Sequence, residues 1–596
     1  MTRLEKSVYF FLAALVWGYV LYRVLYIPIL GDEIFTFFHY LLPGEFMPFH
    51  SVPDANNHFL NTFFGYIIYK LLGVNIYYFR SISIIALLVY LYFTYKLALL
   101  ENHLFGRWAI IVFCLFTHTI IEWFGYYRGY GLMFSFFLAS VYFLVLYFKN
   151  REFNYYWKLN IFLLLALLSN MSVISYVGIC VALTTIYGVI NLRTRKSLIV
   201  MSLFLILWAT TFLFYAKYFF YLNSHGSLYL GETSGFFVGT LANLSLWIFP
   251  VSIYKIFWGL ISGLIGLLFI ALVIHVFKKK TIFIQENGVG LVLVLTILSY
   301  YVLNKLFGSL FPVNRTAEHI LILIMLSVVY EARFWSNFFK RKYIYYSLVG
   351  ILFLIPLFSL TKVLPIQYSL DNKFRIKENF YKIIEENSTS LTTISGPDYT
   401  KYNYLWYKYI NKGKSNIPQS SGYSSKACDI IILDDKNLLT DFINEYIILD
   451  SFPENEMYLL KKNEITSKDF YYSLLTDSFY VSSNEEFISV AKDWIVQEDL
   501  PQNLLFNYEL SLKTPKDYVG VYLVITMFDN SGNVLKYEAI ILDYFSKNHL
   551  GFIEIDNSIY ITDIPADTKT VVTYIWNMKR KELTIEDNRI TVYEIK

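Results

Sequence analysis

Residues 8–30 read VYFFLAALVWGYVLYRVLYIPIL, and this run sets the fold class of the whole chain. A membrane-spanning helix needs about 20 consecutive apolar residues, which the run provides. It is too long for the core of a signal peptide, and no small-residue cleavage site follows it. We therefore interpret it as the first of several membrane spans.

Further apolar runs follow the first one, and together they predict about eleven spans. Runs 107–122 and 157–169 are short, as expected for tilted helices that are buried among neighbours. The predicted spans are 8–30, 76–99, 107–122, 128–148, 157–169, 171–191, 197–220, 252–277, 288–307, 316–333 and 343–363.

The composition changes along the chain. Of the 596 residues, 56% are hydrophobic and 16% are charged, whereas ordinary soluble domains carry about 25% charged residues. Apolar runs dominate up to about Lys362, and polar residues dominate beyond it. The sequence therefore predicts a polytopic α-helical membrane domain, 1–365, followed by a soluble region. The net charge of +4 says little about partners, and no nucleic-acid partner is expected.

Basic residues alternate between the predicted loops in the way that the positive-inside rule describes. This pattern predicts a multi-pass protein with a cytoplasmic N-terminus and an extracytoplasmic C-terminal region. The abundance of Phe, Tyr, Ile, Lys and Asn hints at a bacterial chain, for which we expect the inner (plasma) membrane. The predicted extracytoplasmic loops would hold few basic residues. These are Lys70 and, at the edges of spans, Arg128, Lys217, Lys255 and Arg315. The cytoplasmic loops would hold Arg3, Lys6, Arg107, Lys149, Arg151, Lys158, Arg193, Arg195, Lys196, Lys278, Lys279, Lys280, Arg333, Lys340, Arg341 and Lys342.

Two of the predicted extracytoplasmic loops are long, 31–75 and 221–251. Within the first, residues 58–72 carry apolar side chains at helical spacing and a polar side at Asn61, Thr62 and Lys70. The segment is too short to span comfortably. It is therefore predicted to be an amphipathic helix that lies in the membrane interface.

The soluble region divides into two predicted parts. Alternating strand and helix patterns indicate a small α/β domain at 366–463, without a glycine-rich phosphate loop. Strand patterns around the turn Asp529–Gly532 indicate a β-sandwich at 464–596. The sandwich could bind carbohydrate or could serve as a lid or spacer. The predicted elements are strands 391–395, 428–433, 446–449, 521–528, 534–542, 552–561 and 570–576, and helices 399–412 and 436–445.

The chain has three cysteines, and they make no disulfide framework. Cys114 and Cys180 lie in apolar runs, and Cys428 stands alone in the soluble region. Their pattern therefore gives no information on the redox compartment.

Ionisable residues cluster at the extracytoplasmic ends of the spans, where they are costly and therefore candidates for function. Asp32 and Glu33 directly follow the first span, and such a pair could supply a general base with a raised pKa. The alternative is a helix cap, because acids suit a helix N-terminus.

A second group lies in the first loop, where His50, Asp54 and His58 could bind a divalent metal. Their spacing matches no established metal site. A hydrogen-bonded loop that includes Asn57 and leads into the helix near His58 is the alternative.

Two further candidates contain arginine. Arg128 lies in a polar island with Glu122 and Tyr130, where it could hold an anionic group or extend to the interface. Arg315 lies before the tenth span and could clamp a phosphate, or could pair with Glu318 or Asp32. The sequence contains no Walker loop and no zinc signature.

In their order along the chain these residues resemble the GT-C glycosyltransferases. The resemblance covers about residues 8–333, and the most similar branch contains the protein O-mannosyltransferases and lipid A aminoarabinose transferases. The chain has His58–Phe59–Leu60 where relatives often have His-Pro-Pro-Leu. The motifs are Asp32–Glu33, the histidine-led helix after residues 54–58, Arg80 in Tyr78–Ile82, Arg128-x-Tyr130, and Pro312-x-x-Arg315–Thr316.

The resemblance implies a reaction and roles for residues. A sugar on a polyprenyl phosphate would pass, with inversion, to a hydroxyl of a lipid, glycan or protein acceptor on the extracytoplasmic side of the bilayer. Asp32 would accept the proton, and Glu33 would orient Asp32 or the acceptor. Relatives of this branch often need no metal, so none is required, although His50, Asp54 and His58 keep a divalent metal possible. The leaving phosphate would be stabilised by Arg315 with Arg128 or Lys217, and Arg80 would contact the donor phosphate or anchor its span.

Other functions remain as alternatives. A transporter or flippase of lipid-linked saccharide would need polar residues through several mid-span positions, but the polar residues here cluster at one face. A polysaccharide polymerase or ligase would share the extracytoplasmic active face and the lipid carrier, but it would lack an Asp-Glu pair directly after the first span. A non-catalytic scaffold would tolerate replacement of Asp32 and Arg315.

Overall fold

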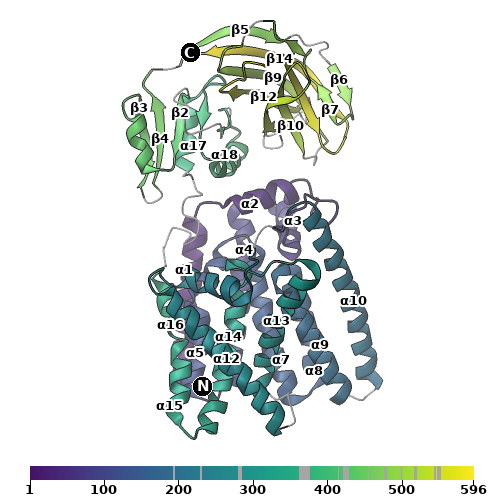
Figure 1. The fold of residues 1–596 in the computed structure, drawn as a ribbon, viewed down its shortest axis with the longest axis vertical. Coiled ribbons are helices and arrows are strands. Elements are labelled where there is room, and N and C mark those ends of the chain that lie inside the picture. Colours follow the sequence, from purple (N-terminus) through teal and green to yellow (C-terminus); the bar gives the residue numbers. More distant parts are fainter. Residues whose placement is uncertain are drawn as a thin grey trace. The chain divides into compact units, whose positions relative to one another are not determined.

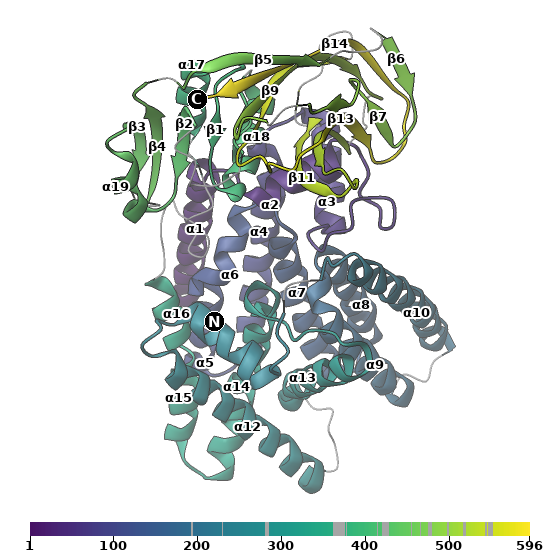
Figure 2. The ribbon, with the colours of Figure 1, turned by 45° about the horizontal axis from the view of Figure 1, so that its top comes forward.

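The protein is described by a computed structural model, shown in Figure 1 and Figure 2. The described residues are 1–191, 195–228, 231–279, 285–361, 376, 378–413, 415–419, 428–453, 456–464, 466–474, 480–497, 500–515, 520–542, 545 and 552–596. Packing divides the chain into two compact units. The first unit comprises Met1–Ile27 and Phe46–Ser369, and the second comprises Pro28–Glu45 and Leu370–Lys596.

The first unit is a bundle of long apolar helices that stand side by side in both views (Figure 1, Figure 2). Among the described residues, nine helices are long and apolar enough to cross a membrane. This confirms the predicted polytopic α-helical membrane domain. The helices are α1 (Arg3–Tyr26), α4 (Ile76–Leu100), α7 (Gly129–Asn150), η3 with α9 (Met171–Val173, Ile174–Asn191), α10 (Arg195–Ser224), α12 (Tyr254–Lys279), α13 (Gln285–Phe307), α14 (Glu318–Phe338), and α15 with α16 (Lys342–Ile351, Leu354–Leu360).

The two short predicted spans have different structures. The third is a pair of helices, α5 (Leu104–Phe116) and α6 with η2 (His118–Glu122, Trp123–Gly125), bent by 46° where Thr117 adopts an extended backbone conformation. The fifth is α8 (Phe153–Ser169), a helix of 17 residues. If the bent pair counts as one span, the described residues contain ten spans. The eleventh predicted span is α8, which is too short to be counted among them.

Successive helices alternate in direction, so the bundle has two distinct ends. One end carries the α6–α7, α8–α9 and α13–α14 connections, and we call it the polar end. The other carries the α4–α5 and α7–α8 connections and most of the predicted cytoplasmic basic residues, of which Arg193 and Lys280 lie outside the described residues. At this basic end Arg107 pairs with Glu5 at 3.6 Å, and Arg333 pairs with Glu101.

The predicted amphipathic helix is present as α3 (Phe59–Leu72). Its polar side chains Asn61 and Thr62 are buried against the bundle, whereas Leu71 and Leu72 are exposed. An outward apolar face suits a helix at the lipid interface. The second long loop contains a short helical stretch, η4 (Phe236–Leu241) followed by α11 (Ala242–Ile248).

The second unit contains three sheets, which confirms the predicted α/β and β-sandwich regions. Strands β1 (Ile394–Ser395), β2 (Ile430–Leu433), β4 (Met457–Lys462) and β3 (Tyr446–Phe452) form the first sheet in that order, beside α17 (Glu378–Asn387) and α18 (Asp398–Asn411). The predicted helix 436–445 is shorter in the structure, as η6 (Lys436–Leu438) and α19 (Leu439–Phe442).

The sandwich has two antiparallel five-stranded sheets. The predicted strand 552–561 coincides with β12, and the hairpin at Asp529–Gly532 joins β10 to β11. One sheet contains β11 (Val534–Ile541), β10 (Val521–Phe528), β13 (Thr570–Asn577), β7 (Phe487–Ser489) and β8 (Trp494–Ile495). The other contains β12 (Phe552–Ile561), β9 (Leu504–Lys513), β14 (Leu583–Ile595), β5 (Lys468–Leu474) and β6 (Tyr480–Ser483).

The α/β sheet and the sandwich share a hydrophobic core. Ile431 and Leu460 of the α/β sheet pack in one buried cluster with Leu505, Tyr560 and Ile595 of the sandwich. The two predicted domains therefore form one packed unit.

Candidate active site

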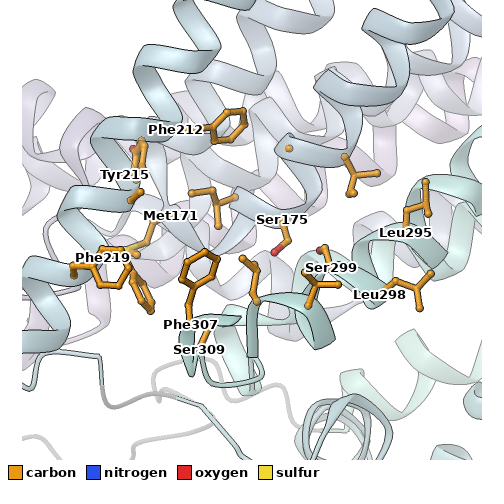
Figure 3. A pocket seen from close by; sticks show the side chains of 17 residues that line it. Met171, Ser175, Phe212, Tyr215, Phe219, Leu295, Leu298, Ser299, Phe307 and Ser309 are labelled. Carbon is orange, nitrogen blue, oxygen red and sulfur yellow. The ribbon is translucent and has the colours of Figure 1, made fainter. Parts of the chain in front are cut away.

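An apolar groove lies between three helices of the first unit (Figure 3). It has a volume of about 570 Å³ and is formed by η3 and α9, by α10 and by α13. The few polar side chains in it include Ser175, Ser299 and Ser309, and none of the described residues that line it is charged. The labelled side chains in Figure 3 are Met171, Ser175, Phe212, Tyr215, Phe219, Leu295, Leu298, Ser299, Phe307 and Ser309.

A smaller and more polar cavity adjoins this groove at the polar end. Its volume is about 200 Å³, and it shares Met171, Ile174, Ser175, Phe219, Leu303 and Ser309 with the groove. The two spaces are thus neighbours with common walls. Polar residues that line the smaller space, which we call the polar cavity, include Asn56, His58, Tyr130, Asn170, Ser172 and Thr316.

Three buried polar atoms at the wall of the polar cavity have no hydrogen-bond partner among the described residues. They are His58 Nε2, Asn170 Nδ2 and Ser172 Oγ. Buried polar groups without partners are costly, so such atoms gather where a polar ligand group binds. The arrangement therefore fits a ligand that is polar at one end and apolar at the other.

The sequence places His58 at the cavity through tight packing at Gly129. A Cβ at residue 129 would lie 2.1 Å from the Ser169 carbonyl oxygen and 2.6 Å from His58 Cβ, so only glycine permits this approach. The His58 ring meets the edge of Tyr130 with 5.4 Å between ring centroids. His58 directly precedes α3, and Tyr127 fixes this helix by donating a hydrogen bond of 2.9 Å to Asn61 O.

Arg128 and Arg315 give the polar cavity a positive environment. Arg128 is buried, and its Nη2 donates a 2.9 Å hydrogen bond to Oδ1 of Asn56, which lines the cavity. The charges of Arg128 and Arg315 add to the effect of burial in lowering the pKa of His58. Neither arginine is among the lining residues, and the described lining contains no carboxylate. Neutral polar groups thus form part of the cavity wall, and the Arg128 cation is bonded to one of them, which suits an anion.

Burial, together with the charges of Arg128 and Arg315, holds the pKa of His58 well below its usual value of about 6.5. Below that pH the unfolded chain therefore binds one proton more than the folded chain. The free energy of unfolding should fall by up to about 1.4 kcal/mol per pH unit as pH drops from 6.5 to 5.

Thermal melts in detergent between pH 7.5 and 5 check this prediction. We expect His58→Gln to flatten the loss of stability at low pH. His225→Gln, which changes an exposed histidine, should keep the wild-type slope. Equal slopes for wild type and His58→Gln would contradict the assignment of a neutral, buried His58.

The other predicted residues of the polar end have structural partners. Glu122 forms a buried ion pair with Arg23 at 2.7 Å. Arg80 Nη1 donates to the carbonyl oxygens of Val24 and Ile27, at 3.1 and 2.7 Å, and so binds the end of α1 to α4. These contacts match the anchoring alternative for Arg80.

Further predicted residues fix the first loop and its neighbours. Asn57 Nδ2 donates to Phe46 O at 2.9 Å, and Asp54 Oδ1 accepts from Asn56 N at 2.7 Å. Lys217 is exposed, and its Nζ lies 4.8 Å from the centroid of the Phe49 ring. Glu318 accepts hydrogen bonds from the indoles of Trp123 and Trp247, at 2.6 and 3.0 Å.

The structure does not bring the predicted metal ligands together. Within the described part of the chain no group of three His, Cys, Asp or Glu side chains is placed to hold a metal ion, and His50, Asp54 and His58 are all described.

Asp32 and Glu33 belong to the second unit. They lie in the first turn of α2 (Gly31–Thr36), and Glu33 Oε2 accepts a 2.9 Å hydrogen bond from Leu30 N. Glu33 therefore caps its own helix, as the alternative predicted. Asp32 is only half-buried, and its main-chain oxygen accepts a hydrogen bond from Thr36 Oγ1 at 2.8 Å.

Sequence reasoning missed Asn170 and Ser172. Asn170 Oδ1 accepts from Ser172 N at 2.9 Å, which caps η3 and leaves Nδ2 at the cavity wall. The signal in the sequence is the polar interruption Ser169–Asn170–Met171–Ser172 between two apolar runs, at the same end as Arg128.

The second unit has a cavity of its own, of about 420 Å³. Lys408 lines it and lies 5.0 Å from the Phe545 ring centroid, and burial lowers the pKa of Lys408 to about 8. Glu509, Glu554 and Asp556 also line it. The carbohydrate-binding and spacer alternatives for the sandwich remain predictions.

Comparisons with known proteins give distant structural neighbours. No family model and no curated protein matches the chain. A crystal structure of ArnT from Cupriavidus metallidurans bound to undecaprenyl phosphate is similar at 9% identity and a TM-score of 0.39, covering 78% of this chain and 99% of that one. The apo structure of that protein gives 8% identity and a TM-score of 0.41, covering 77% and 98%.

A cryo-EM structure of the arabinosyltransferase EmbB from Mycobacterium smegmatis is similar at 9% identity and a TM-score of 0.27, covering 98% of this chain and 64% of that one. At these TM-scores the likeness carries no argument by itself.

Proposed function

We propose that this protein is a glycosyltransferase that takes its sugar from a polyprenyl-phosphate donor. The observation that carries the proposal is the apolar groove that shares six wall residues with a polar cavity. An isoprenoid chain is purely apolar and suits the groove. Its phosphate is anionic and suits the polar cavity. The positive charges of Arg128 and Arg315 are felt there, since both lower the pKa of the lining residue His58.

The proposed reaction is transfer with inversion to an acceptor hydroxyl. The acceptor oxygen forms a bond to the anomeric carbon as the bond between that carbon and the phosphate oxygen breaks. The electron pair leaves with the lipid phosphate, and the acceptor proton passes to the Asp32 carboxylate. Arg128 and Arg315 stabilise the charge that the phosphate gains, because fixed cations in a water-poor site do so at little reorganisation cost.

The reaction is placed on the extracytoplasmic side, with the N-terminus cytoplasmic, because basic residues gather at the opposite end of the bundle. The acceptor is a hydroxyl of a lipid, glycan or protein. A flippase is the second candidate, but the described cavity with unpaired polar atoms lies at one end of the bundle. Translocation would need polar positions through its middle.

Filling the groove tests the proposal. Ala216 lines the groove on α10, and Ala216→Trp should block the lipid chain. We expect the dissociation constant for undecaprenyl phosphate to rise about tenfold, which corresponds to about 1.4 kcal/mol. Binding of a short-chain analogue should be unchanged, because its phosphate still reaches the polar cavity.

The matched control is Leu213→Trp. Leu213 lies on the same helix, is 72% exposed and does not line the groove. If both tryptophans weaken lipid binding equally, or if neither does, the groove does not hold the chain of the donor.

A further inference from the structure

The acid-bearing segment of the first loop is part of the second unit. Residues 28–45, which we call the first-loop segment, contain α2 and the π-helix η1 (Phe37–Leu41). They cluster with the C-terminal residues 370–596, although α1 directly precedes them in the sequence. Several of the contacts that hold them come from α18.

The first contact is a buried hydrogen bond. Asn403 Nδ2 donates to the carbonyl oxygen of Ile29 at 2.6 Å, and both residues are buried. Ile29 lies two residues before the first turn of α2. The bond therefore fixes the main chain just before Asp32.

The second contact is a cluster of aromatic rings that covers η1. The ring of Phe37 meets Trp406 edge to face at 5.2 Å and Tyr409 at 5.7 Å, and Phe38 meets Tyr409 at 5.3 Å. Phe37, Phe38 and Trp406 are buried. Edge-to-face pairs have a preferred geometry, so the cluster fixes orientation as well as contact.

The third contact is at the end of the first-loop segment. Lys579, which follows β13, forms an ion pair with Glu45. Burial and the charge of Lys579 lower the pKa of His39 to about 4, so His39 is neutral at pH 7 and adds no like charge beside the lysine.

We propose that α18 positions Asp32, so that the second unit has a role beyond that of a spacer. The proposal rests on the proposed function, in which Asp32 accepts the acceptor proton. Asn403 and Trp406 are positioning residues, because they act on Asp32 through the first-loop segment. Small displacements of a reacting group are expensive, and an error of about 1 Å can cost about a hundredfold in rate.

The first test replaces Asn403 in the full-length protein. Asn403→Ala should speed hydrogen exchange of the amides of Gly31–Thr36 at least tenfold, as measured by mass spectrometry, and should lower kcat about a hundredfold. The dissociation constant of undecaprenyl phosphate should be unchanged. The control is Asn379→Ala, which removes an exposed hydrogen bond in the same unit. In it the side-chain amide of Asn379 donates to Asp450 Oδ2 at 2.7 Å, and its loss should change none of these quantities.

The second test compares a partial and a complete loss of the aromatic ring at Trp406. Trp406→Phe retains a ring against Phe37 and Phe38 and should keep most of the activity, whereas Trp406→Ala should behave like Asn403→Ala. Unchanged exchange at Gly31–Thr36 and unchanged kcat in Asn403→Ala and Trp406→Ala would overturn the positioning role.

Asp32→Asn separates this inference from the proposed function. If Asp32→Asn retains full turnover, the proposed proton transfer fails. If Asp32→Asn is inactive but the two alanine variants are fully active, only the positioning role of α18 fails.

Discussion

Replacing Asp32 by asparagine should lower the rate of sugar transfer about a thousandfold, because a general base contributes roughly 10² to 10⁴ in rate. The substitution keeps the size and polarity of the side chain, so α2 should still form. Lipid-phosphate binding should be unchanged, because the groove and the polar cavity belong to the first unit. Single-turnover assays with a radiolabelled donor measure the first effect, and lipid titration measures the second.

Glu33→Gln is the natural comparison for Asp32→Asn. Glu33 is buried and its carboxylate accepts the Leu30 N–H, a bond that a glutamine oxygen can also accept. We therefore expect a much smaller loss of rate for Glu33→Gln. Full transfer by Asp32→Asn, or an equal loss in both variants, would remove Asp32 as the base.

Replacing Arg128 by glutamine should weaken donor binding and lower turnover by about 10² to 10³, the usual effect of losing one stabilising group for a developing oxyanion. Arg128 is buried beside the polar cavity and bonds to Asn56, so its charge acts at short range in a site of low dielectric. Arg128→Lys should retain part of the effect, because it keeps the charge but loses the planar guanidinium.

Arg107→Gln serves as the control for Arg128→Gln. It also removes one arginine from the bundle, but at the basic end, where Arg107 pairs with Glu5. It should leave donor affinity unchanged. Donor affinity that is retained by Arg128→Gln, with elution in size-exclusion chromatography as for the wild type, would show that Arg128 does not bind the phosphate.

The membrane helices could be predicted from the sequence because their signal is local. A run such as 8–30 identifies a span without reference to any other residue. Likewise, strand 552–561 carries its own pattern and coincides with β12. The groove could not be predicted in this way, because it is a space between α9, α10 and α13, and each of these helices is simply apolar in sequence.

The candidate site was predictable only in part. His58, Arg128 and Arg315 stand out as polar residues at the ends of apolar runs, and in the structure the charges of both arginines help to lower the pKa of His58. Asn170 and Ser172 have short neutral side chains, and in sequence their pattern is that of an ordinary boundary between two helices. The attachment of Asp32 to the soluble unit depends on Asn403, which lies 374 residues from its partner Ile29, and no local pattern encodes such a contact.

Cleavage of the donor by the purified protein tests the central claim most directly. The protein in detergent would be incubated with a panel of radiolabelled polyprenyl-phosphate sugars, and release of the sugar to water or to an acceptor would be followed over time. We predict release from at least one donor by the wild type, and its loss in both Asp32→Asn and Arg128→Gln. Release that both variants retain in full, or no release from any donor, would contradict the account.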